Sequence, residues 1–499
     1  MKKTIQIMDT TLRDGEQTCG VAFSKVEKML LTQRLLKDLG ANRVEITSAR
    51  VSPEEKINLT DIMRWAEKNN FVENIEVLSF TDKTKSVDWL LPTGCKCLNL
   101  LTKGSKRHCE LQLGKTPKEH LDNIKETYNY AVKNGMSLSL YLEDWSGGML
   151  SDKDYVFYML DAYKEWNIFK RFYLCDTLGI LDYEKTYKFV DEITQKYPEL
   201  EFEFHGHNDY GLATANAIAA IKGGISGIHG TINGLGERAG NANLVEVAVN
   251  IKDNLGLKTT INEKKLKDIS ALVATFSRKR IGDNAPIIGA DVFTQTAGVH
   301  ADGDKKGNLY VSQLIPVRFG ANRVYALGKL SGKSNIEMNL KELGLELNDE
   351  QKKILLEKVV ALGDKKEIVT QNDLEFMAKD LLGEIRQNNF KIVECIITST
   401  LSMRPFATIK VNYKNKIYET TGEGNGGYDA FMKALRNVSD KAGFKIPKLL
   451  DYEVHIPTGG NTDALVECVI TWENNIKTHA VSSDQVVAAM LATEKIVNL

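Results

Sequence analysis

Short runs of β-branched and apolar residues recur through the first half of the chain, and a segment with helical periodicity follows each run. Between the runs, apolar residues repeat every three to four positions, as they do in an amphipathic helix. Alternation of strand and helix predicts a parallel sheet, and eight such units in about 250 residues predict an α/β fold of the closed (β/α)8 TIM barrel type. The eight strand-like runs begin at Ile5, Arg43, Ile75, Cys97, Leu138, Arg171, Glu201 and Gly227.

An open, doubly wound sheet is the alternative arrangement of the same elements. Such sheets usually carry a GxGxxG turn after the first strand, and this chain has none there. Helix boundaries are well marked in the sequence: Ser24 and Gly40 flank one predicted helix, and Thr116 and Gly135 flank another. Hydroxyl side chains accept hydrogen bonds from the free N–H groups at a helix start, and glycine readily ends a helix. The closed barrel remains the preferred prediction.

The pattern changes twice after Lys252. A helical segment is followed by an irregular, glycine-containing stretch over 287–310, and two further helical stretches reach about Gln387. The last part of the chain contains an internal repeat of two strands and a helix, which predicts an α+β domain with a ββα-type repeat. We therefore predict a barrel over residues 1–285, a linker region over 286–387 and a C-terminal domain over 388–499.

Acids, imidazoles and amides follow most of the predicted barrel strands. Catalytic groups of such barrels lie at the carboxyl ends of several strands, which meet at one rim. Simple strand caps would be more scattered and would mostly be serine, asparagine or lysine. The sequence therefore predicts an active site at this rim, with candidates at Asp9, Arg13, Asp14, Glu45, Glu143, Asp144, Asp176, Thr177, His205, His207, Asp209, Asn233, Glu237 and Asn241.

The HGH triplet after the seventh strand points to a metal. Side chains alternate along an extended strand, so His205 and His207 share a face and two imidazoles can bind one ion. Asp14 and Asn241 at the same rim supply a third and a fourth candidate ligand. Mixed nitrogen and oxygen ligands suit Zn, Mn, Co or Mg and do not decide among them. The alternative is that both histidines are hydrogen-bonded structural residues.

Arg13 lies next to the candidate ligand Asp14. A metal with open positions can bind a 2-oxo acid and polarise its carbonyl group, and a neighbouring arginine can stabilise the oxyanion formed when a carbon nucleophile attacks. These residues thus predict a carbon–carbon bond-forming reaction on a 2-oxo acid. The alternative for Arg13 is a surface ion pair with Glu16.

Composition limits the kinds of molecule that this protein is expected to bind. The 65 basic and 66 acidic residues nearly balance, so no overall field favours nucleic acid or an anionic membrane. No stretch of about 18 apolar residues and no signal-peptide pattern is found, so we expect a cytoplasmic protein without a membrane span. The seven cysteines are scattered and lack zinc-site spacing, and we expect them to be reduced core residues. A small-molecule substrate is the remaining prediction.

Four motifs, DTTLRDGEQ, HGHND, NGLGERAGN and AGVHADG, occur in that order and resemble the acyl-CoA Claisen-condensing family of 2-isopropylmalate, homocitrate and citramalate synthases. The resemblance covers essentially the whole chain. It implies a homodimer that uses acetyl-CoA as co-substrate and a divalent metal ion. Within the family pattern, the metal ligands match Asp14, His205, His207 and Asn241, the catalytic arginine matches Arg13, the 2-oxo acid pocket matches Glu143 and Thr177, and residues lent by one subunit's linker to the other's active site match His300, Asp302 and Tyr310. His300, supported by Asp302, is the leading candidate for the general base.

Strand ends three, four and five are expected to line the 2-oxo acid pocket, and they supply Leu78, Leu101 and Tyr141. These bulky, mainly apolar side chains leave space for little more than a methyl group, which favours pyruvate. The stretch EITSAR departs from the ExGxP pattern of the isopropylmalate and homocitrate branches. The citramalate-forming branch, on the pyruvate route to isoleucine, is therefore the prediction. A 2-isopropylmalate synthase and a non-catalytic amino-acid sensor are the alternatives, and the linker and the repeat argue against a lyase.

The C-terminal repeat resembles the leucine- or isoleucine-sensing regulatory domain of that family. Its glycine-rich turn TGEGNGGYDAF opens a predicted helix and offers free N–H groups to an amino-acid carboxylate. Tyr428 and Asp429 are the candidate contacts, with isoleucine expected as the feedback ligand and leucine as the second choice. The alternative is an ordinary strand-to-helix turn.

Overall fold

The computed structural model describes residues 4–364, 369, 371–382, 390–400, 402–455 and 466–498. The chain forms two compact units: the first comprises Met1–Phe293 and Ser312–Asn322, and the second comprises Thr294–Val311 and Arg323–Leu499. The predicted boundary after residue 387 lies outside the described residues.

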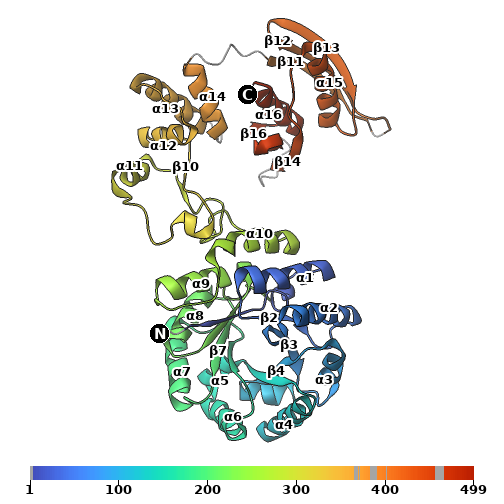
Figure 1. The fold of residues 1–499 in the computed structure, drawn as a ribbon, viewed down its shortest axis with the longest axis vertical. Coiled ribbons are helices and arrows are strands. Elements are labelled where there is room, and N and C mark those ends of the chain that lie inside the picture. Colours follow the sequence, from blue (N-terminus) through green and yellow to red (C-terminus); the bar gives the residue numbers. More distant parts are fainter. Residues whose placement is uncertain are drawn as a thin grey trace. The chain divides into compact units, whose positions relative to one another are not determined.

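Eight parallel strands form a closed barrel in the first unit (Figure 1). Each strand pairs with the next, and β1 closes the barrel by pairing with β8 from Gln6–Gly227 to Asp9–Gly230. The predicted (β/α)8 barrel is confirmed. Its strands are β1 (Gln6–Asp9), β2 (Arg43–Ser48), β3 (Ile75–Phe80), β4 (Cys97–Lys103), β5 (Ser137–Glu143), β6 (Phe172–Asp176), β7 (Phe202–Gly206) and β8 (Gly227–Gly230).

Helices surround the barrel and begin where the sequence marks them. The hydroxyls of Ser24 and Thr116 each accept a hydrogen bond from the backbone of a glutamate three residues later, whose carboxylate accepts one in return. Gly40 ends the first helical region in the left-handed conformation. The helices are α1 (Lys25–Gln33), α2 (Pro53–Asn69), α3 (Lys85–Leu90), α4 (Pro117–Lys133), α5 (Trp145–Ser151), α6 (Lys153–Trp166), α7 (Tyr183–Lys196), α8 (Ala213–Lys222), α9 (Leu244–Asp253) and α10 (Leu266–Ser277).

Strand alternation divides the barrel side chains between two environments. Phe202 and Phe204 on β7 point outward into the large apolar core between strands and helices. Inside the barrel lies a much smaller apolar cluster of Met8, Leu78, Leu101, Tyr141, Tyr173 and Cys175. The remaining inward positions carry polar and charged side chains, and these supply the candidate site.

Residues 312–322 belong to the barrel unit although the preceding residues 294–311 do not. Arg318 donates to Asp253 at 2.8 Å from Nη1 and to Glu263 at 2.7 Å from Nε. The ring of Phe319 stacks on Phe293, with centroids 5.8 Å apart and planes 14° from parallel. The chain is therefore fixed to the barrel on both sides of the segment 294–311.

The second unit begins with short strands and helices. A two-stranded parallel sheet joins β9 (Thr294–Gln295) and β10 (Val324–Tyr325). The stretch predicted as irregular contains a helix, α11 (Gly298–Gly307), in which Asp304 is buried and pairs with Arg323 at 2.5 Å. Where two helices were predicted, the described residues of this stretch form three: α12 (Lys333–Leu343), α13 (Asp349–Asp364) and α14 (Gln371–Leu381).

The predicted internal repeat at the C-terminus is confirmed, and each half has one strand more than the sequence pattern showed. Each half is a three-stranded antiparallel sheet followed by a helix that packs on it (Figure 1). Both halves contribute to one apolar core. The elements are β11 (Phe390–Thr398), β12 (Phe406–Tyr413), β13 (Lys416–Glu423), α15 (Gly427–Ala442), β14 (Leu449–His455), β15 (Val466–Trp472), β16 (Lys477–Ser482) and α16 (Gln485–Asn498).

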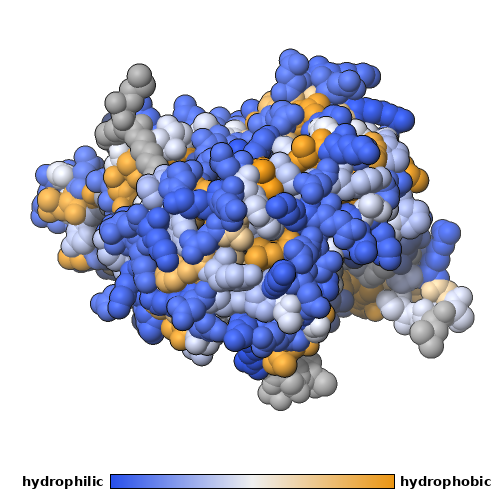
Figure 2. All heavy atoms as spheres, turned by 90° about the horizontal axis from the view of Figure 1, so that it is seen from below, coloured by the Kyte–Doolittle hydropathy of each residue, from blue (hydrophilic) through white to orange (hydrophobic). Residues whose placement is uncertain are grey.

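The face seen in Figure 2 is mostly hydrophilic, with hydrophobic residues in small separate groups. Within the described ranges, none of the helices combines the length and the apolar character needed to cross a bilayer. All seven cysteines are free thiols, as predicted, but Cys19 is exposed and Cys395 is partly exposed, so they are not all core residues.

Candidate active site

The loop after β1 carries two of the predicted site residues and is tightly held. The N–H groups of Arg13, Asp14 and Gly15 all donate to the carbonyl oxygen of Thr10, which folds the loop back on the end of β1. Glu16 is tied to the helices through the fully buried Lys28, whose Nζ lies 2.7 Å from Glu16. Arg13 is also buried, so the alternative of a surface ion pair between Arg13 and Glu16 is wrong.

Asp14, His205 and His207 form a buried cluster at the carboxyl ends of the strands. One potential ligand atom from each of the three lies within 4.8 Å of the other two. His205 Nε2 is 3.1 Å and His207 Nε2 is 3.8 Å from Asp14 Oδ2. Asn241 joins the cluster because its backbone forms a β-bridge with His207. The structure therefore brings three of the four predicted ligands together and places the backbone of the fourth beside His207.

The donor atoms of this cluster suit a cation. The side-chain oxygen of Asn241 and Nδ1 of both histidines are buried and have no hydrogen-bond partner among the described residues. Burial lowers the pKa of His207 to about 4, which keeps its ring neutral and able to bind a metal. Two imidazoles, a carboxylate and an amide oxygen are ligands that Zn²⁺, Mn²⁺, Co²⁺ and Mg²⁺ all accept to different degrees.

Arg13 connects this cluster to the barrel interior. Its Nη1 lies 3.1 Å from Asp14, its Nε donates to Glu45 at 2.6 Å, and its Nη2 donates to the Tyr141 hydroxyl at 3.1 Å. Burial opposes the charge on Arg13 and on Asp14. The attraction of Glu45 and Asp14 together outweighs burial and raises the pKa of Arg13, and the attraction of Arg13 together with the two histidines lowers the pKa of Asp14. Both groups are therefore charged at neutral pH.

The three residues predicted to select the 2-oxo acid lie together. Leu78 and Tyr141 are buried in the small apolar cluster inside the barrel, and Leu101 packs against it. The Tyr141 ring also contacts His205 edge to face, with centroids 5.6 Å apart. An apolar wall and the arginine thus meet at Tyr141, next to the candidate metal ligands.

Glu143 and Thr177 have partners of their own at the rim. The carboxylate of Glu143 pairs with the ammonium group of Lys103. The hydroxyl oxygen of Thr177 accepts a hydrogen bond from the Asp144 N–H at 2.8 Å, which leaves the hydroxyl proton of Thr177 to donate elsewhere. Asp144 has a left-handed backbone conformation, with φ 59°, at the turn between β5 and α5.

A buried charged network beneath the rim was not predicted. Arg43 donates to both carboxylate oxygens of Glu203 at 2.6 Å, and Glu203 lies 2.9 Å from the ring of His229. Burial lowers the pKa of His229 to about 4, and the Arg43 and His229 contacts lower that of Glu203 to about 2 despite its burial. The signal was present in the sequence: Glu203 precedes His205 by two residues and so shares its face.

The predicted linker residues lie in the second unit. The rings of His300 and Tyr310 are in contact, with centroids 4.1 Å apart. The carboxylate of Asp302 instead pairs with Lys306 at 2.5 Å and accepts a longer hydrogen bond from Ser334. His300 and Asp302 are both on α11, whose backbone passes close to Gly332: a Cβ atom on Gly298 would lie 2.7 Å from the Gly332 Cα.

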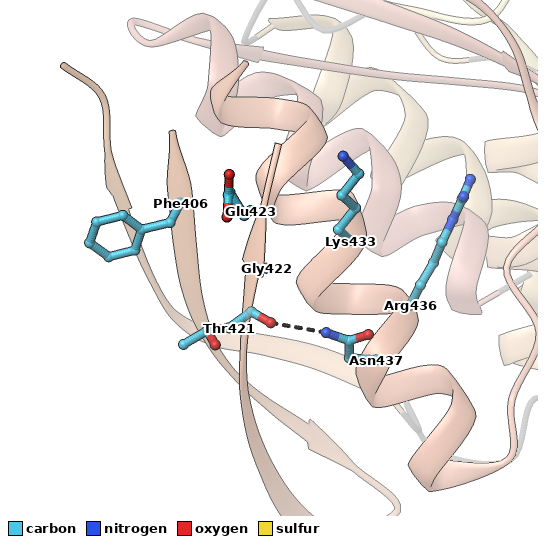
Figure 3. A pocket seen from close by; sticks show the side chains of 7 residues that line it. All are labelled: Phe406, Thr421, Gly422, Glu423, Lys433, Arg436 and Asn437. Atoms are coloured by element: carbon cyan, nitrogen blue, oxygen red, sulfur yellow. Dashed lines mark hydrogen bonds between the residues drawn. The ribbon is translucent and has the colours of Figure 1, made fainter. Parts of the chain in front are cut away.

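The C-terminal candidates Tyr428 and Asp429 have contacts within their own domain. The Tyr428 hydroxyl lies 2.7 Å from that of Thr493, and its ring stacks on Tyr452 with centroids 5.1 Å apart. Asp429 accepts a hydrogen bond from the Asn425 N–H and pairs with Lys433. One turn further along α15 is an open hollow of about 740 Å³ (Figure 3), lined by Phe406, Thr421, Gly422, Glu423, Lys433, Arg436 and Asn437.

Fold and site together define a (β/α)8-barrel protein with a candidate metal centre at the carboxyl-end rim. Comparison with protein families agrees: residues 4–273 match the HMGL-like family, 287–367 match the homocitrate synthase post-HMGL domain-like family, and 368–499 match the LeuA allosteric (dimerisation) domain. The chain belongs to the HMGL-like family.

Several relatives match nearly the whole chain. A putative (R)-citramalate synthase of Methanopyrus kandleri is 32% identical over 92% of this chain and 88% of its own length. The (R)-citramalate synthase of Methanocaldococcus jannaschii is 31% identical over 93% of this chain and 92% of its own. The 2-isopropylmalate synthase of the same organism is also 31% identical, over 98% of this chain and 93% of its own. Overall identity therefore does not distinguish these two kinds of relative.

Proposed function

We propose that this protein condenses acetyl-CoA and pyruvate with water to give (R)-citramalate and free coenzyme A. The observation that carries the choice of pyruvate is the apolar wall of Leu78, Leu101 and Tyr141, which adjoins Arg13 and the candidate metal ligands. A substrate with a second carboxylate would call for a cation at this wall, and a branched substrate would call for more space.

The residues of the barrel have distinct roles in this proposal. Asp14, His205, His207 and Asn241 hold a divalent cation, which when bound polarises the carbonyl group of the 2-oxo acid. Arg13 is fixed by Glu45 and Asp14 so that its guanidinium can stabilise the negative charge that develops on the carbonyl oxygen. Glu143 and Thr177 bind the 2-oxo acid, for which the free hydroxyl proton of Thr177 is suited.

The linker supplies the remaining groups. We assign His300 as the general base that removes a methyl proton from acetyl-CoA, with Asp302 and Tyr310 near it on the same segment. The LeuA dimerisation domain matched by residues 368–499 supports a homodimer, in which one subunit's linker completes the active site of the other. The free thiols support a cytoplasmic enzyme.

A 2-isopropylmalate synthase is the second candidate, because a relative with that activity in its name is as similar as the citramalate synthases. The test is a free-thiol assay of coenzyme A release from acetyl-CoA with Mn²⁺ or Mg²⁺. It is run with pyruvate, 2-oxobutanoate, 2-oxoisovalerate and 2-oxoglutarate, and product chirality is checked. Preference for pyruvate supports the proposal, and preference for 2-oxoisovalerate overturns it in favour of the second candidate. Thiol release with none of the four indicates a non-catalytic sensor.

We further propose isoleucine as feedback inhibitor, bound near Tyr428 and Asp429, where both halves of the C-terminal repeat meet. The hollow beside Lys433 and Arg436 is the competing position, because its charges of both signs suit a free amino acid (Figure 3). Full-length Tyr428→Ala and Arg436→Ala are compared in the thiol assay with isoleucine and with leucine. We expect only Tyr428→Ala to lose inhibition. Loss in Arg436→Ala alone would place the effector in the hollow, and inhibition by leucine alone would change its identity.

A further inference from the structure

His229 lies in the middle of the barrel and belongs neither to the candidate metal cluster nor to the apolar wall. Its side chain is fully buried between the carboxylate of Glu203 and the hydroxyl of Tyr141. Both carboxylate oxygens of Glu203 accept from Arg43 Nη2, so Glu203 is ionised and can only accept hydrogen bonds. The proton of the neutral ring must therefore be on Nε2, which lies 2.9 Å from Glu203. This leaves Nδ1 as an acceptor.

Nδ1 of His229 faces the hydroxyl of Tyr141 at 3.4 Å. That hydroxyl already accepts a hydrogen bond from Arg13 Nη2 at 3.1 Å and has one proton to donate. Two acceptors compete for this proton: His229 Nδ1, and Glu45 Oε2 at 3.0 Å. The tautomer set by Glu203 thus decides whether Tyr141 has a second acceptor.

The carboxylate of Glu45 already accepts hydrogen bonds on both of its oxygens. Its Oε2 accepts from Arg13 Nε at 2.6 Å as well as from Tyr141, and its Oε1 accepts from Asn99 at 2.7 Å. When Tyr141 donates to His229 instead, the short hydrogen bond between Glu45 and Arg13 has no competitor on that oxygen. Both the phenol and the guanidinium are then held in single positions.

We propose that His229 is a positioning residue that orients the Tyr141 hydroxyl and, through it, the Arg13 guanidinium, so that both groups meet the 2-oxo acid in one fixed geometry. Glu203, itself bound by Arg43, fixes the ring of His229. The inference rests on the proposed function for its kinetic consequence, but its structural part does not need a substrate.

The first test needs no activity. Histidines of the full-length protein are labelled with ¹⁵N, and the His229 signals are assigned by their loss in His229→Gln. At neutral pH we expect a ring with its proton on Nε2 and an unprotonated Nδ1 whose signal shifts in Tyr141→Phe. A proton on Nδ1, or an Nδ1 signal that Tyr141→Phe leaves in place, overturns the proposal even if the enzyme is fully active.

The second test uses the 2-oxo acid that the thiol assay selects. His229→Gln retains a donor for Glu203 and loses the acceptor at the Nδ1 position, whereas His229→Asn retains an acceptor there. We expect His229→Gln to raise KM for the 2-oxo acid about tenfold, the value of one hydrogen bond, with KM for acetyl-CoA unchanged and a smaller effect in His229→Asn.

A double-mutant cycle separates positioning from packing. In the Tyr141→Phe background, His229→Gln is expected to change KM for the 2-oxo acid by less than about twofold, because the contact it removes is already absent. An equal effect in both backgrounds would show that His229 acts only by filling the interior. If His229→Gln does not fold, the tautomer measurement still decides the question, with the His229 signals assigned by their loss in His229→Asn.

Discussion

Charged side chains inside the barrel and the pair of Asp302 and Lys306 near His300 are held in different ways. Arg13 and Arg43 are buried, and each contacts two carboxylates that are themselves buried. On α11, Lys306 and Asp302 form a single pair in which both side chains are exposed. Burying a charged pair costs free energy but fixes the positions of both groups, whereas an exposed pair constrains its two side chains weakly. The charges of the barrel interior are thus preorganised, whereas Asp302 on α11 is held weakly and His300 is in ring contact with Tyr310.

The largest effect is expected from Arg13→Lys. Lysine keeps the charge but cannot contact Asp14, Glu45 and Tyr141 together, so the charge would no longer be fixed where the oxyanion develops. We expect kcat to fall about 100- to 1,000-fold. The measurement is steady-state coenzyme A release, with metal content determined in parallel. Activity close to that of the unaltered enzyme would remove Arg13 from the mechanism.

Arg43→Met tests how much the buried ion pairs of the barrel interior contribute to stability. The substitution leaves Glu76 and Glu203 buried, and among the described residues only the more distant Arg171 is then a cationic neighbour, at 3.5 and 3.4 Å. We expect the free energy of unfolding to fall by about 3 kcal/mol, at the lower end of the usual range for breaking a buried pair. Urea unfolding of the barrel, followed by tryptophan fluorescence, measures it. A loss below about 1 kcal/mol, the usual value of an exposed pair, would mean that the buried charges contribute no more to stability than exposed ones.

The same network predicts acid sensitivity. The pKa of His229 is lowered to about 4, so its neutral form contributes stability that is complete above pH 6.5 and is lost as the pH falls toward 4. The lowered pKa of Glu203, about 2, adds a further loss below pH 4.5. We expect about 3 kcal/mol to be lost between pH 7 and pH 4 from His229. Urea midpoints across this range measure it, and His229→Gln should flatten the upper part of the profile.

Leu78→Ala tests the apolar wall at the border of the preorganised region. Removing three carbons from a buried position enlarges the pocket, so 2-oxobutanoate, which is one carbon longer than pyruvate, should be used more efficiently. We expect kcat/KM for 2-oxobutanoate to improve about tenfold relative to pyruvate. Competition between the two substrates in the thiol assay measures the ratio. If the ratio stays constant, the 2-oxo acid binds elsewhere.

The smallest effect is expected from Lys306→Met, the exposed counterpart of Arg43→Met. The pair with Asp302 is in solvent, so its loss should leave the free energy of unfolding nearly unchanged. The same urea experiment serves for both variants. A destabilisation as large as that of Arg43→Met would mean that the two regions do not differ in the way described.

The fold and the rim cluster could be predicted because both depend on local periodicity. The two-residue spacing of His205 and His207 gave their common face, and strand order gave the proximity of Asp14. The alternation in EFEFHGH also showed that Glu203 shares that face, but only the closed barrel shows that Arg43 and His229 converge on it from β2 and β8. Buried positions are usually apolar, so a charged residue is not expected there, and the partners that make its burial possible are distant in sequence.

Helix α11 escaped prediction for a different reason. Gly298, Gly303 and Gly307 lower its helix propensity, and its apolar residues have no helical period. The structure replaces these local signals by tertiary ones: Asp304 is buried against Arg323, and the missing side chain at Gly298 lets the backbone approach Gly332. Neither contact can be recognised from the helix sequence alone.

The return of residues 312–322 to the barrel has a consequence for synthesis. The carboxylates of Asp253 and Glu263 receive their arginine only when Arg318 has left the ribosome, more than fifty residues after the helix α9 that carries Asp253. Until then the nascent barrel has two acidic groups without this partner and an uncovered ring at Phe293. The barrel therefore completes its surface late, and the segment with His300 emerges before the last part of the barrel that anchors it.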